Sequence, residues 1–147
     1  MDRKEFFKSC GLACVGGIGI AAILQSCATG QHFASSEIVG NKLNVMLTEF
    51  TLNKKGESVD RKYVLVRSEK LNFPIYLYKV SATEYSASWM ECTHQGVELS
   101  AHGEHLVCSA HGSEFDTLGN VTQGPAQTNL RKFKTSIEGK YIQIQLS

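Results

Sequence analysis

From residue 41 onward, short runs of β-branched, aromatic and aliphatic residues are separated by polar turns. The first two runs flank the polar segment 53–58, which predicts a β-hairpin, and Pro74 breaks the chain before the third run. No run shows the spacing of an amphipathic helix. The pattern predicts an all-β fold with strands in residues 43–52, 59–67, 75–80, 85–90 and 130–146, and core positions at Val64, Val66, Ile75, Leu77 and Trp89.

The first 27 residues follow a different pattern. Three basic residues precede an uncharged run, rich in Gly and Ala, over residues 10–24. A membrane-spanning helix needs about 20 apolar residues, so this shorter run favours the core of a signal peptide. The alternative is an uncleaved membrane anchor, because no Asp, Glu, Lys or Arg occurs between Ser9 and Ser36.

Two details of this segment indicate export. Residues 3–8 (RKEFFK) resemble a relaxed twin-arginine export motif, and residues 24–27 (LQSC) resemble a bacterial lipobox. Cleavage at the lipobox would make Cys27 the first mature residue, acylated on its sulfur and amine. Polar residues follow, among which His32 is expected to be solvated. We expect a signal peptide with a lipobox over residues 1–27, a tether or lead into the first strand over 28–40, and a folded domain over 41–147.

The length of the chain and its net charge limit the classes of function that it can have. The 147 residues suit one domain plus a targeting segment. The residues after Cys27 carry 12 basic and 12 acidic side chains, so this part of the chain is neutral. A neutral chain lacks the basic surface that binds phosphate backbones, which argues against a nucleic-acid partner.

Two short clusters of metal-binding side chains stand close together in the sequence. Cys92 and His94 form the first cluster, and Cys108 and His111 form the second. Each cluster offers one thiolate and one imidazole, which are ligands that iron, zinc and copper take in proteins. A glycine follows each histidine within two residues and lets the backbone approach a ligand closely. Two such turns would hold a metal cofactor from two sides.

The spacing Cys-x-His-x-Gly followed by Cys-x-x-His-Gly-Ser resembles the Rieske iron–sulfur proteins. The loop Gly124-Pro125-Ala126 and a terminal strand pair follow, as in that family. The resemblance implies a cluster of two irons and two sulfides. Histidine ligation places the reduction potential of such clusters at roughly −150 to +300 mV. By resemblance, one iron takes Cys92 and Cys108, and the other takes His94 and His111.

The same resemblance implies the fold, with stacked antiparallel sheets and a cluster-binding subdomain, about residues 86–127, inserted between strands of a base subdomain. A structural zinc site built from the same four ligands is the alternative, although zinc sites rarely use the Cys-x-His step. A visible spectrum separates the two, since iron–sulfur proteins are brown and zinc proteins are colourless.

The surroundings of the motif depart from the respiratory members of the family. In those proteins a Ser donates to a bridging sulfide and a Tyr two residues later donates to a ligand thiolate. Ser113 matches the first position, so the resemblance makes it a cluster-binding residue, but Phe115 at the second cannot donate. Two cysteines that join the loops by a disulfide are replaced by Val97 and Ala110. We therefore expect an intermediate reduction potential, loops held by packing and hydrogen bonds, and Pro125 stiffening the covering loop.

Residues 80–130 contain no Lys or Arg. An acidic shell there would steer a basic partner to the cluster end, unless these carboxylates are simply solvated. His102 and His105 invite a metal-site interpretation, but polar loop residues are the expected identity. The acidic residues of this stretch are Glu84, Glu91, Glu98, Glu104, Glu114 and Asp116.

Three functions fit the sequence. The first is a one-electron carrier that is exported, tethered to the membrane by a lipid on Cys27 or by an N-terminal anchor, and faces the periplasm or cell exterior. Its partner would be a redox protein such as a cytochrome or an oxidoreductase subunit, and it would act as a carrier or as the iron–sulfur subunit of an oxidoreductase complex. The second is the Rieske ferredoxin of an oxygenase system, against which the N-terminus argues. The third is a zinc-binding lipoprotein without a redox role.

Overall fold

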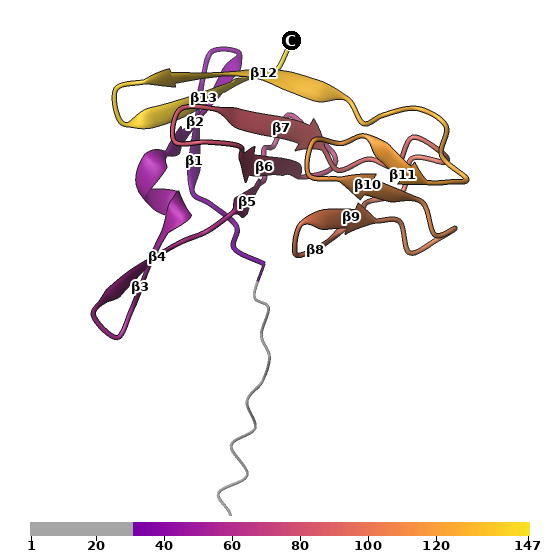
Figure 1. The fold of residues 1–147 in the computed structure, drawn as a ribbon. Helices are drawn as coiled ribbons and strands as arrows, with labels where there is room; N and C mark the ends of the chain where they lie inside the picture. The colour runs from indigo at the N-terminus through magenta and orange to yellow at the C-terminus, as the bar shows by residue number, and fades with distance from the viewer. Residues whose placement is uncertain (1–30) are drawn as a thin grey trace, which may run out of the picture.

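The computed structural model describes residues 31–147 (Figure 1). The expected signal peptide, the lipobox with Cys27 and residues 28–30 lie outside the described residues. Thirteen strands and one short 3-10 helix make up the described part, and they form three antiparallel sheets. No helix in residues 31–147 has the length and apolar character that a membrane span requires. The predicted all-β class is confirmed.

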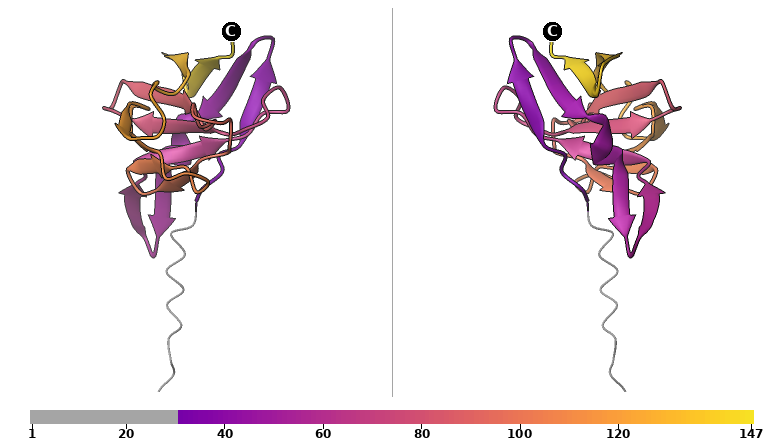
Figure 2. Two further views of the ribbon diagram at one scale, coloured as in Figure 1. Left: turned by 90° about the vertical axis from the view of Figure 1, so that its right-hand side faces the viewer. Right: turned by 90° about the vertical axis from the view of Figure 1, so that its left-hand side faces the viewer.

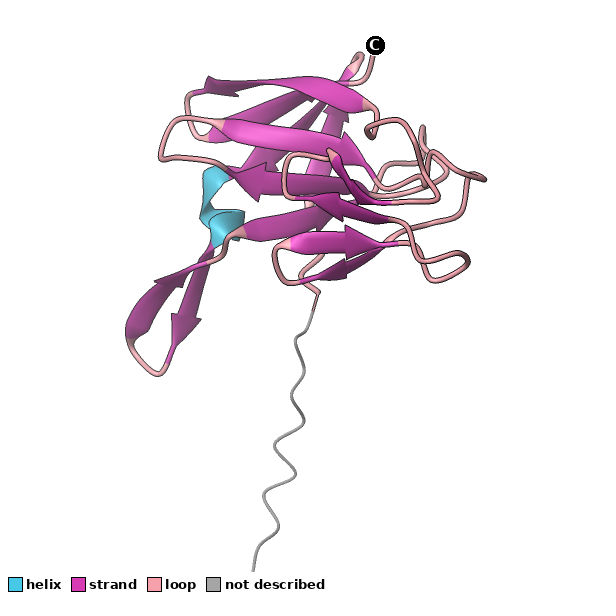
Figure 3. Cartoon of the chain, turned by 45° about the vertical axis from the view of Figure 1, so that its right-hand side comes forward, coloured by secondary structure: helices cyan, strands magenta, loops and turns pink. Residues whose placement is uncertain are grey.

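The three sheets form a base, an insertion that carries the two predicted ligand loops, and a separate hairpin (Figures 1 and 3). The large sheet contains, in spatial order, β1 (Ser36–Val39), β2 (Lys42–Met46), β13 (Tyr141–Gln145), β12 (Lys132–Glu138), β7 (Tyr85–Trp89), β6 (Ile75–Lys79) and β5 (Tyr63–Val66). The second sheet contains β11 (Val121–Gln123), β10 (Glu114–Asp116), β9 (His105–Val107) and β8 (Ser100–His102). The 3-10 helix η1 (Leu47–Phe50) leads into the hairpin of β3 (Thr51–Lys54) and β4 (Glu57–Asp60).

The first predicted hairpin forms with shorter strands than the pattern suggested. The run 43–52 is divided between β2, η1 and β3, because η1 turns Phe50 into the base core, where its side chain is 1% exposed. The hairpin itself closes at Lys55 and Gly56. The later predicted strands agree with β6, β7, β12 and β13 to within two residues at each end.

Strands β5, β6 and β7 are buried on both faces. Val64, Leu77 and Ala87 lie on one face and pack into the base core. Leu65 and Tyr76 alternate with them on the other face and belong to a second core, which also contains both candidate ligand cysteines. These three strands therefore separate two hydrophobic cores, and the apolar residues of both faces stabilise the arrangement.

Pairing of β7 with β12 shows where the second sheet is inserted. Ala87 lies opposite Phe133, and Ser88 lies opposite Lys132. Residues 90–131 thus leave the large sheet after Trp89 and return to it at β12, so the insertion begins about four residues later than the sequence suggested.

Tyrosines join the insertion to the base. Tyr76 donates from its hydroxyl to the carbonyl of Gly103 at 3.3 Å, and Tyr78 donates to Glu104 Oε1 at 3.1 Å. The ring centroids of Tyr63 and Tyr76 are 4.8 Å apart. Burial, followed by the neighbouring phenols and Glu104, raises the pKa of Tyr76 well above its usual range, so this hydroxyl stays a donor.

The first described residues are part of the fold. Phe33 forms a parallel bridge with Leu65 at the edge of the large sheet, and Gln31 Nε2 donates to the carbonyl of Ala101 in β8 at 3.1 Å. His32 is only partly solvated, with its side chain 32% exposed and its Nε2 2.6 Å from Glu49 Oε2. From residue 31 onward, the expected tether is therefore the lead into the first strand.

Gly119 lies where the insertion packs against the base, so a substitution there tests how close this packing is. Its φ is +78°, and an added Cβ would lie 2.7 Å from Ser88 Oγ and 3.2 Å from Leu130 Cβ. We predict that Gly119→Ala lowers the free energy of unfolding by about 2 to 5 kcal/mol, from left-handed strain plus overpacking. Denaturant unfolding measures the change. Gly103→Ala is the control, since its φ is +61° and no atom lies within 4 Å; equal losses in both variants would contradict close seating.

Candidate metal centre

The first ligand loop connects β7 to β8 and is closed at its cysteine. The amide of Cys92 donates to the carbonyl of Val97 at 2.8 Å, and the amide of Gly96 donates to the carbonyl of Cys92 at 2.8 Å. Both backbone groups of Cys92 are thereby fixed. His94 lies at the outside of this turn, two residues after the cysteine.

The second ligand loop connects β9 to β10 and repeats the same closure. The amide of Cys108 donates to the carbonyl of Ser113 at 2.8 Å, and that of Gly112 donates to the carbonyl of Cys108 at 2.9 Å. Gly112 and Gly96 each follow their cysteine by four residues, with φ of +80° and +68°. Glycine is favoured at such positions. Sequence reasoning missed this repeat, although the equal Cys-to-Gly spacing could have revealed it.

The two ligand loops bury their cysteine thiols and expose their histidine imidazoles. Cys92 and Cys108 are each 1% exposed, are free thiols and belong to the second core. His94 and His111 are exposed, and their ring centroids are 4.8 Å apart with the rings nearly perpendicular, at 86°. The structure therefore places the two cysteines in one buried core and the two histidines side by side at the surface.

The imidazole geometry fits a shared metal ion. A metal bound to two ring nitrogens at about 2.1 Å, with a nearly right bond angle, places the ring centroids about 4.6 to 5 Å apart. The observed separation of His94 and His111 is 4.8 Å. Within residues 31–147, no three His, Cys, Asp or Glu side chains surround a single point. The two imidazoles are thus the only pair of these donors for which the described residues give a separation that one metal ion could bridge.

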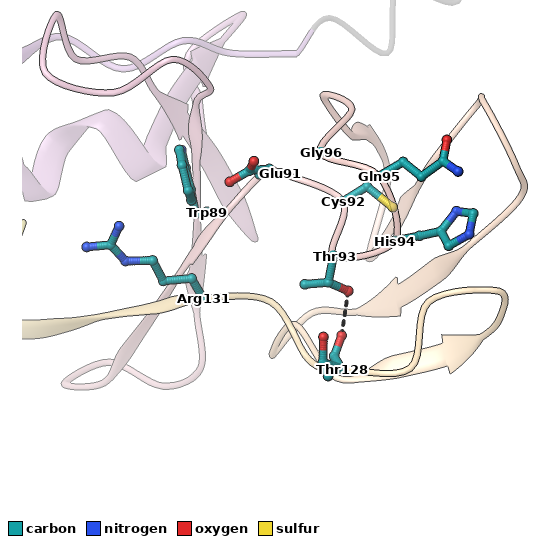
Figure 4. Close-up of a pocket in the computed structure, with 9 residues that line it drawn as sticks. All are labelled: Trp89, Glu91, Cys92, Thr93, His94, Gln95, Gly96, Thr128 and Arg131. Atoms are coloured by element: carbon teal, nitrogen blue, oxygen red, sulfur yellow. Dashed lines mark hydrogen bonds between the residues drawn. The ribbon is translucent and has the colours of Figure 1, made fainter.

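A third loop, between β11 and β12, fastens to both ligand loops. The amide of Ala126 donates to Ser113 Oγ at 3.0 Å, and Thr93 Oγ1 donates to the carbonyl of Thr128 at 2.6 Å (Figure 4). Gln123 Nε2 also donates to the carbonyl of Gly112 at 2.9 Å. No disulfide occurs among the described residues, and these hydrogen bonds hold the loops together as expected.

Ser113 and Phe115 stand under the second loop. Both are 0% exposed. Ser113 Oγ accepts the amide of Ala126, so its own O–H is left to donate toward a neighbouring acceptor. Phe115 packs in the same core as Cys108 and has no hydroxyl. The serine can therefore supply one hydrogen bond to a bound group, and the phenylalanine only contact.

An open hollow of about 420 Å³ lies beside the first loop (Figure 4). At one end the figure shows Cys92, His94 and Gln95, and at the other end Trp89 and Arg131. The guanidinium carbon of Arg131 lies 5.5 Å from the Trp89 ring centroid, so the cation is engaged with an aromatic face.

Three of the six acidic residues in residues 80–130 have partners within the fold. Glu98 lies 3.4 Å from Arg67, and Glu104 accepts from Tyr78. Burial alone would raise the pKa of Asp116, but donors of Asn120 and the following turn outweigh it and hold that pKa below its ordinary value. The Asp116 turn is therefore stabilised at neutral pH and loses this support only as acid protonates the carboxylate. The remaining three acids are Glu84, Glu91 and Glu114.

His102 and His105 lie away from this centre. They face each other across the β8–β9 hairpin, with ring centroids 6.0 Å apart, and both are exposed. They are exposed and polar as expected, but they lie at the strand ends that flank the turn instead of in a loop.

The fold and the centre define a small β protein that carries paired Cys/His ligand loops on an inserted sheet. Residues 48–134, more than half of the chain, match the family described as the Rieske [2Fe-2S] domain. The chain belongs to this family, whose cofactor is a [2Fe-2S] cluster. The family resemblance and the stacked antiparallel fold expected from the sequence are confirmed.

Relatives place the chain among electron-transfer members of the family. It is 24% identical over 149 residues to the cytochrome b6-f complex iron-sulfur subunit of Trichodesmium erythraeum, covering 88% of this chain and 76% of that protein. It is 50% identical over 42 residues to the ubiquinol-cytochrome c reductase iron-sulfur subunit of Rickettsia typhi, covering 26% of this chain and 24% of that protein. The crystal structure of the plasma membrane Rieske protein PetC3 from Synechocystis PCC 6803 superposes with a TM-score of 0.50 and 26% identity, covering 57% of this chain and 86% of that one. The chain is a Rieske iron–sulfur electron-transfer protein, distantly related to these subunits.

Thr93 tests the bond between the first ligand loop and the third loop. We predict that Thr93→Val speeds the loss of the cluster's visible absorbance, because about 1 kcal/mol of loop attachment disappears with the hydrogen bond to Thr128. Thr135→Val is the matched control, since Thr135 Oγ1 donates to the carbonyl of Tyr85 at 2.7 Å in the base. It should lower the unfolding free energy without speeding absorbance loss; identical bleaching rates in both variants would contradict the role of Thr93.

Proposed function

We propose that Cys92, His94, Cys108 and His111 hold the [2Fe-2S] cluster, and that the protein is a membrane-tethered, extracytoplasmic one-electron carrier. The observation that carries the proposal is the division of the four side chains into two buried thiols and two exposed imidazoles, with the rings 4.8 Å apart. When bound, the cluster supplies reversible one-electron transfer at roughly −150 to +300 mV.

The chain's own residues have separable roles in this proposal. The paired backbone hydrogen bonds at Cys92 and Cys108 aim both thiols into the second core, where water is excluded. His94 and His111 present their free edges to solvent, so a partner can approach the site only from that side. Ser113 Oγ accepts the amide of Ala126, so its hydroxyl would be free to donate to the bound group and would stabilise the state with more negative charge.

The proposed partner is a cytochrome or an oxidoreductase subunit. Relatives named as iron-sulfur subunits of the cytochrome b6-f complex and of ubiquinol-cytochrome c reductase support this choice. The chain would then serve as a carrier or as the iron–sulfur subunit of such a complex. Export and anchoring rest on the basic, uncharged and LQSC segments of residues 1–27.

The test of the centre is spectroscopic. We predict two irons and two acid-labile sulfides per purified chain, a brown colour, and an electron paramagnetic resonance signal after dithionite reduction. Cys108→Ser and His111→Ala should abolish the signal, because each removes a proposed ligand. His102→Ala is the control and should keep it, since His102 is exposed away from the centre. A colourless protein that contains zinc and gives no signal would overturn the proposal.

Ser113 and Phe115, which lie under the second ligand loop, give a prediction about the reduction potential of the cluster. Phe115→Tyr should raise the reduction potential and Ser113→Ala should lower it, each on the order of 50 mV, since for one electron this equals about 1 kcal/mol of hydrogen bonding. A spectroelectrochemical titration measures both. Phe50→Tyr is the control, because Phe50 is buried in the base core and should leave the potential unchanged. Unchanged potentials in both site variants would refute the assigned donors.

Anchoring through Cys27 is tested separately. We predict that Cys27→Ser moves the protein from the membrane to the soluble fraction, because the acylated residue is lost. Fractionation and the intact mass of the wild-type chain provide the measurement. Cys14→Ser should not change the location. A Cys27→Ser chain that stays in the membrane would instead support the uncleaved anchor.

A further inference from the structure

The β3–β4 hairpin stands apart from the rest of the described chain (Figures 1 and 3). Its strands pair only with each other. Leu52 and Val59 lie opposite one another on the same face, and Val59 is 48% exposed. An isolated two-stranded hairpin is only marginally stable in water. A surface that covers it would therefore stabilise it.

The tip of this hairpin carries two exposed lysines, Lys54 at the end of β3 and Lys55 in the turn, and one exposed acid, Glu57, opposite Lys54. The two turn residues, Lys55 and Gly56, have φ of +49° and +86°. Such a turn favours Asn, Asp or Gly at its first position. Lysine there costs backbone energy and places a positive charge at the tip of the hairpin.

The hairpin points toward the end at which the described chain begins. In Figures 1 and 2 the indigo start of the chain and the hairpin turn lie at the same lower end, while the β12–β13 turn lies near the upper end. Gln31 and Phe33 are bonded to Ala101 and Leu65, so the point of entry is fixed on the body.

The proposed lipid site is close to this end in the sequence. Four peptide steps separate Cys27 from Gln31, which spans about 14 Å at most. The four-residue strands of the hairpin are about 13 Å long. The chain between Cys27 and Gln31 is thus about as long as the hairpin strands, which is compatible with a membrane that holds Cys27 and contacts the hairpin turn.

We propose that the Lys54–Lys55 turn binds anionic lipid headgroups and so fixes the orientation of the domain on the membrane. The inference rests on the proposed membrane tether. Lysines next to a membrane are attracted to anionic lipids, and the Leu52–Val59 pair behind the turn meets the apolar side of the headgroup region. The ligand loops then lie at the side of the body and stay open to a partner (Figure 1).

The experiment uses the full-length holoprotein in phosphatidylcholine vesicles, with or without phosphatidylglycerol. Lysines are acetylated with a soluble reagent and quantified by mass spectrometry. Acetylation of Lys54 and Lys55 should fall about fivefold in the anionic vesicles, the shift that one cation near an anionic leaflet provides, and should recover in high salt. Lys140, exposed in the β12–β13 turn, is the internal control and should not change.

Lysine variants and sedimentation of the vesicles distinguish the possible results. Lys55→Asn suits the turn and should reduce the protection of Lys54, while Lys140→Asn should not. Equal acetylation in both kinds of vesicle, with the chain sedimenting, would overturn the hairpin contact but keep the tether. Protection that depends on the number of chains per vesicle and not on lipid charge would indicate that the hairpin contacts a second copy of the chain. This result would also overturn the proposed lipid contact. A chain left in the supernatant would overturn both the tether and the contact.

Discussion

Burial of both faces of β5, β6 and β7 is the constraint on which the molecule depends. Leu77 and its neighbours fill the base core, while Tyr76 and Leu65 on the alternate positions fill the core under the ligand loops. A sheet that is apolar on both faces must be covered on both sides. The inserted sheet supplies the second cover, so the centre and the base stabilise each other through the same three strands.

At the centre, backbone hydrogen bonds take over the role of a covalent link. Each ligand cysteine has its amide and carbonyl fixed within its own loop, and the third loop bonds to one residue in each, Thr93 and Ser113. Each bond contributes only about 1 kcal/mol. Their placement matters more than their sum, because together they restrict how far the two ligand loops can separate.

Sequence patterns predicted the fold class and the later strands, and the motif spacing predicted four ligands, of which the two cysteines share one core and the two histidines lie side by side. These features depend on local periodicity and on spacing within single turns. The split of the run 43–52 at Phe50 and the bond between His32 and Glu49 could not be predicted, since both depend on residues brought together only in the folded chain. For the same reason, polar residues 31–40 looked like a tether although Phe33 and β1 join the sheet.

The number of acidic residues in residues 80–130 overstates the negative electrostatic potential at the ligand loops. Asp116 is engaged in its own turn, and Glu98 and Glu104 face Arg67 and Tyr78 of the base. Glu98 and Glu104 thereby connect the insertion to the base, and paired or hydrogen-bonded charges contribute less to long-range steering than free ones. The residues that line the surface beside His94 include the uncharged Gln95 and Gln127, while Glu91 and Arg131 there carry opposite charges. The proposed redox partner would therefore recognise this end mainly by shape and neutral polar contacts, with electrostatic steering as a smaller effect.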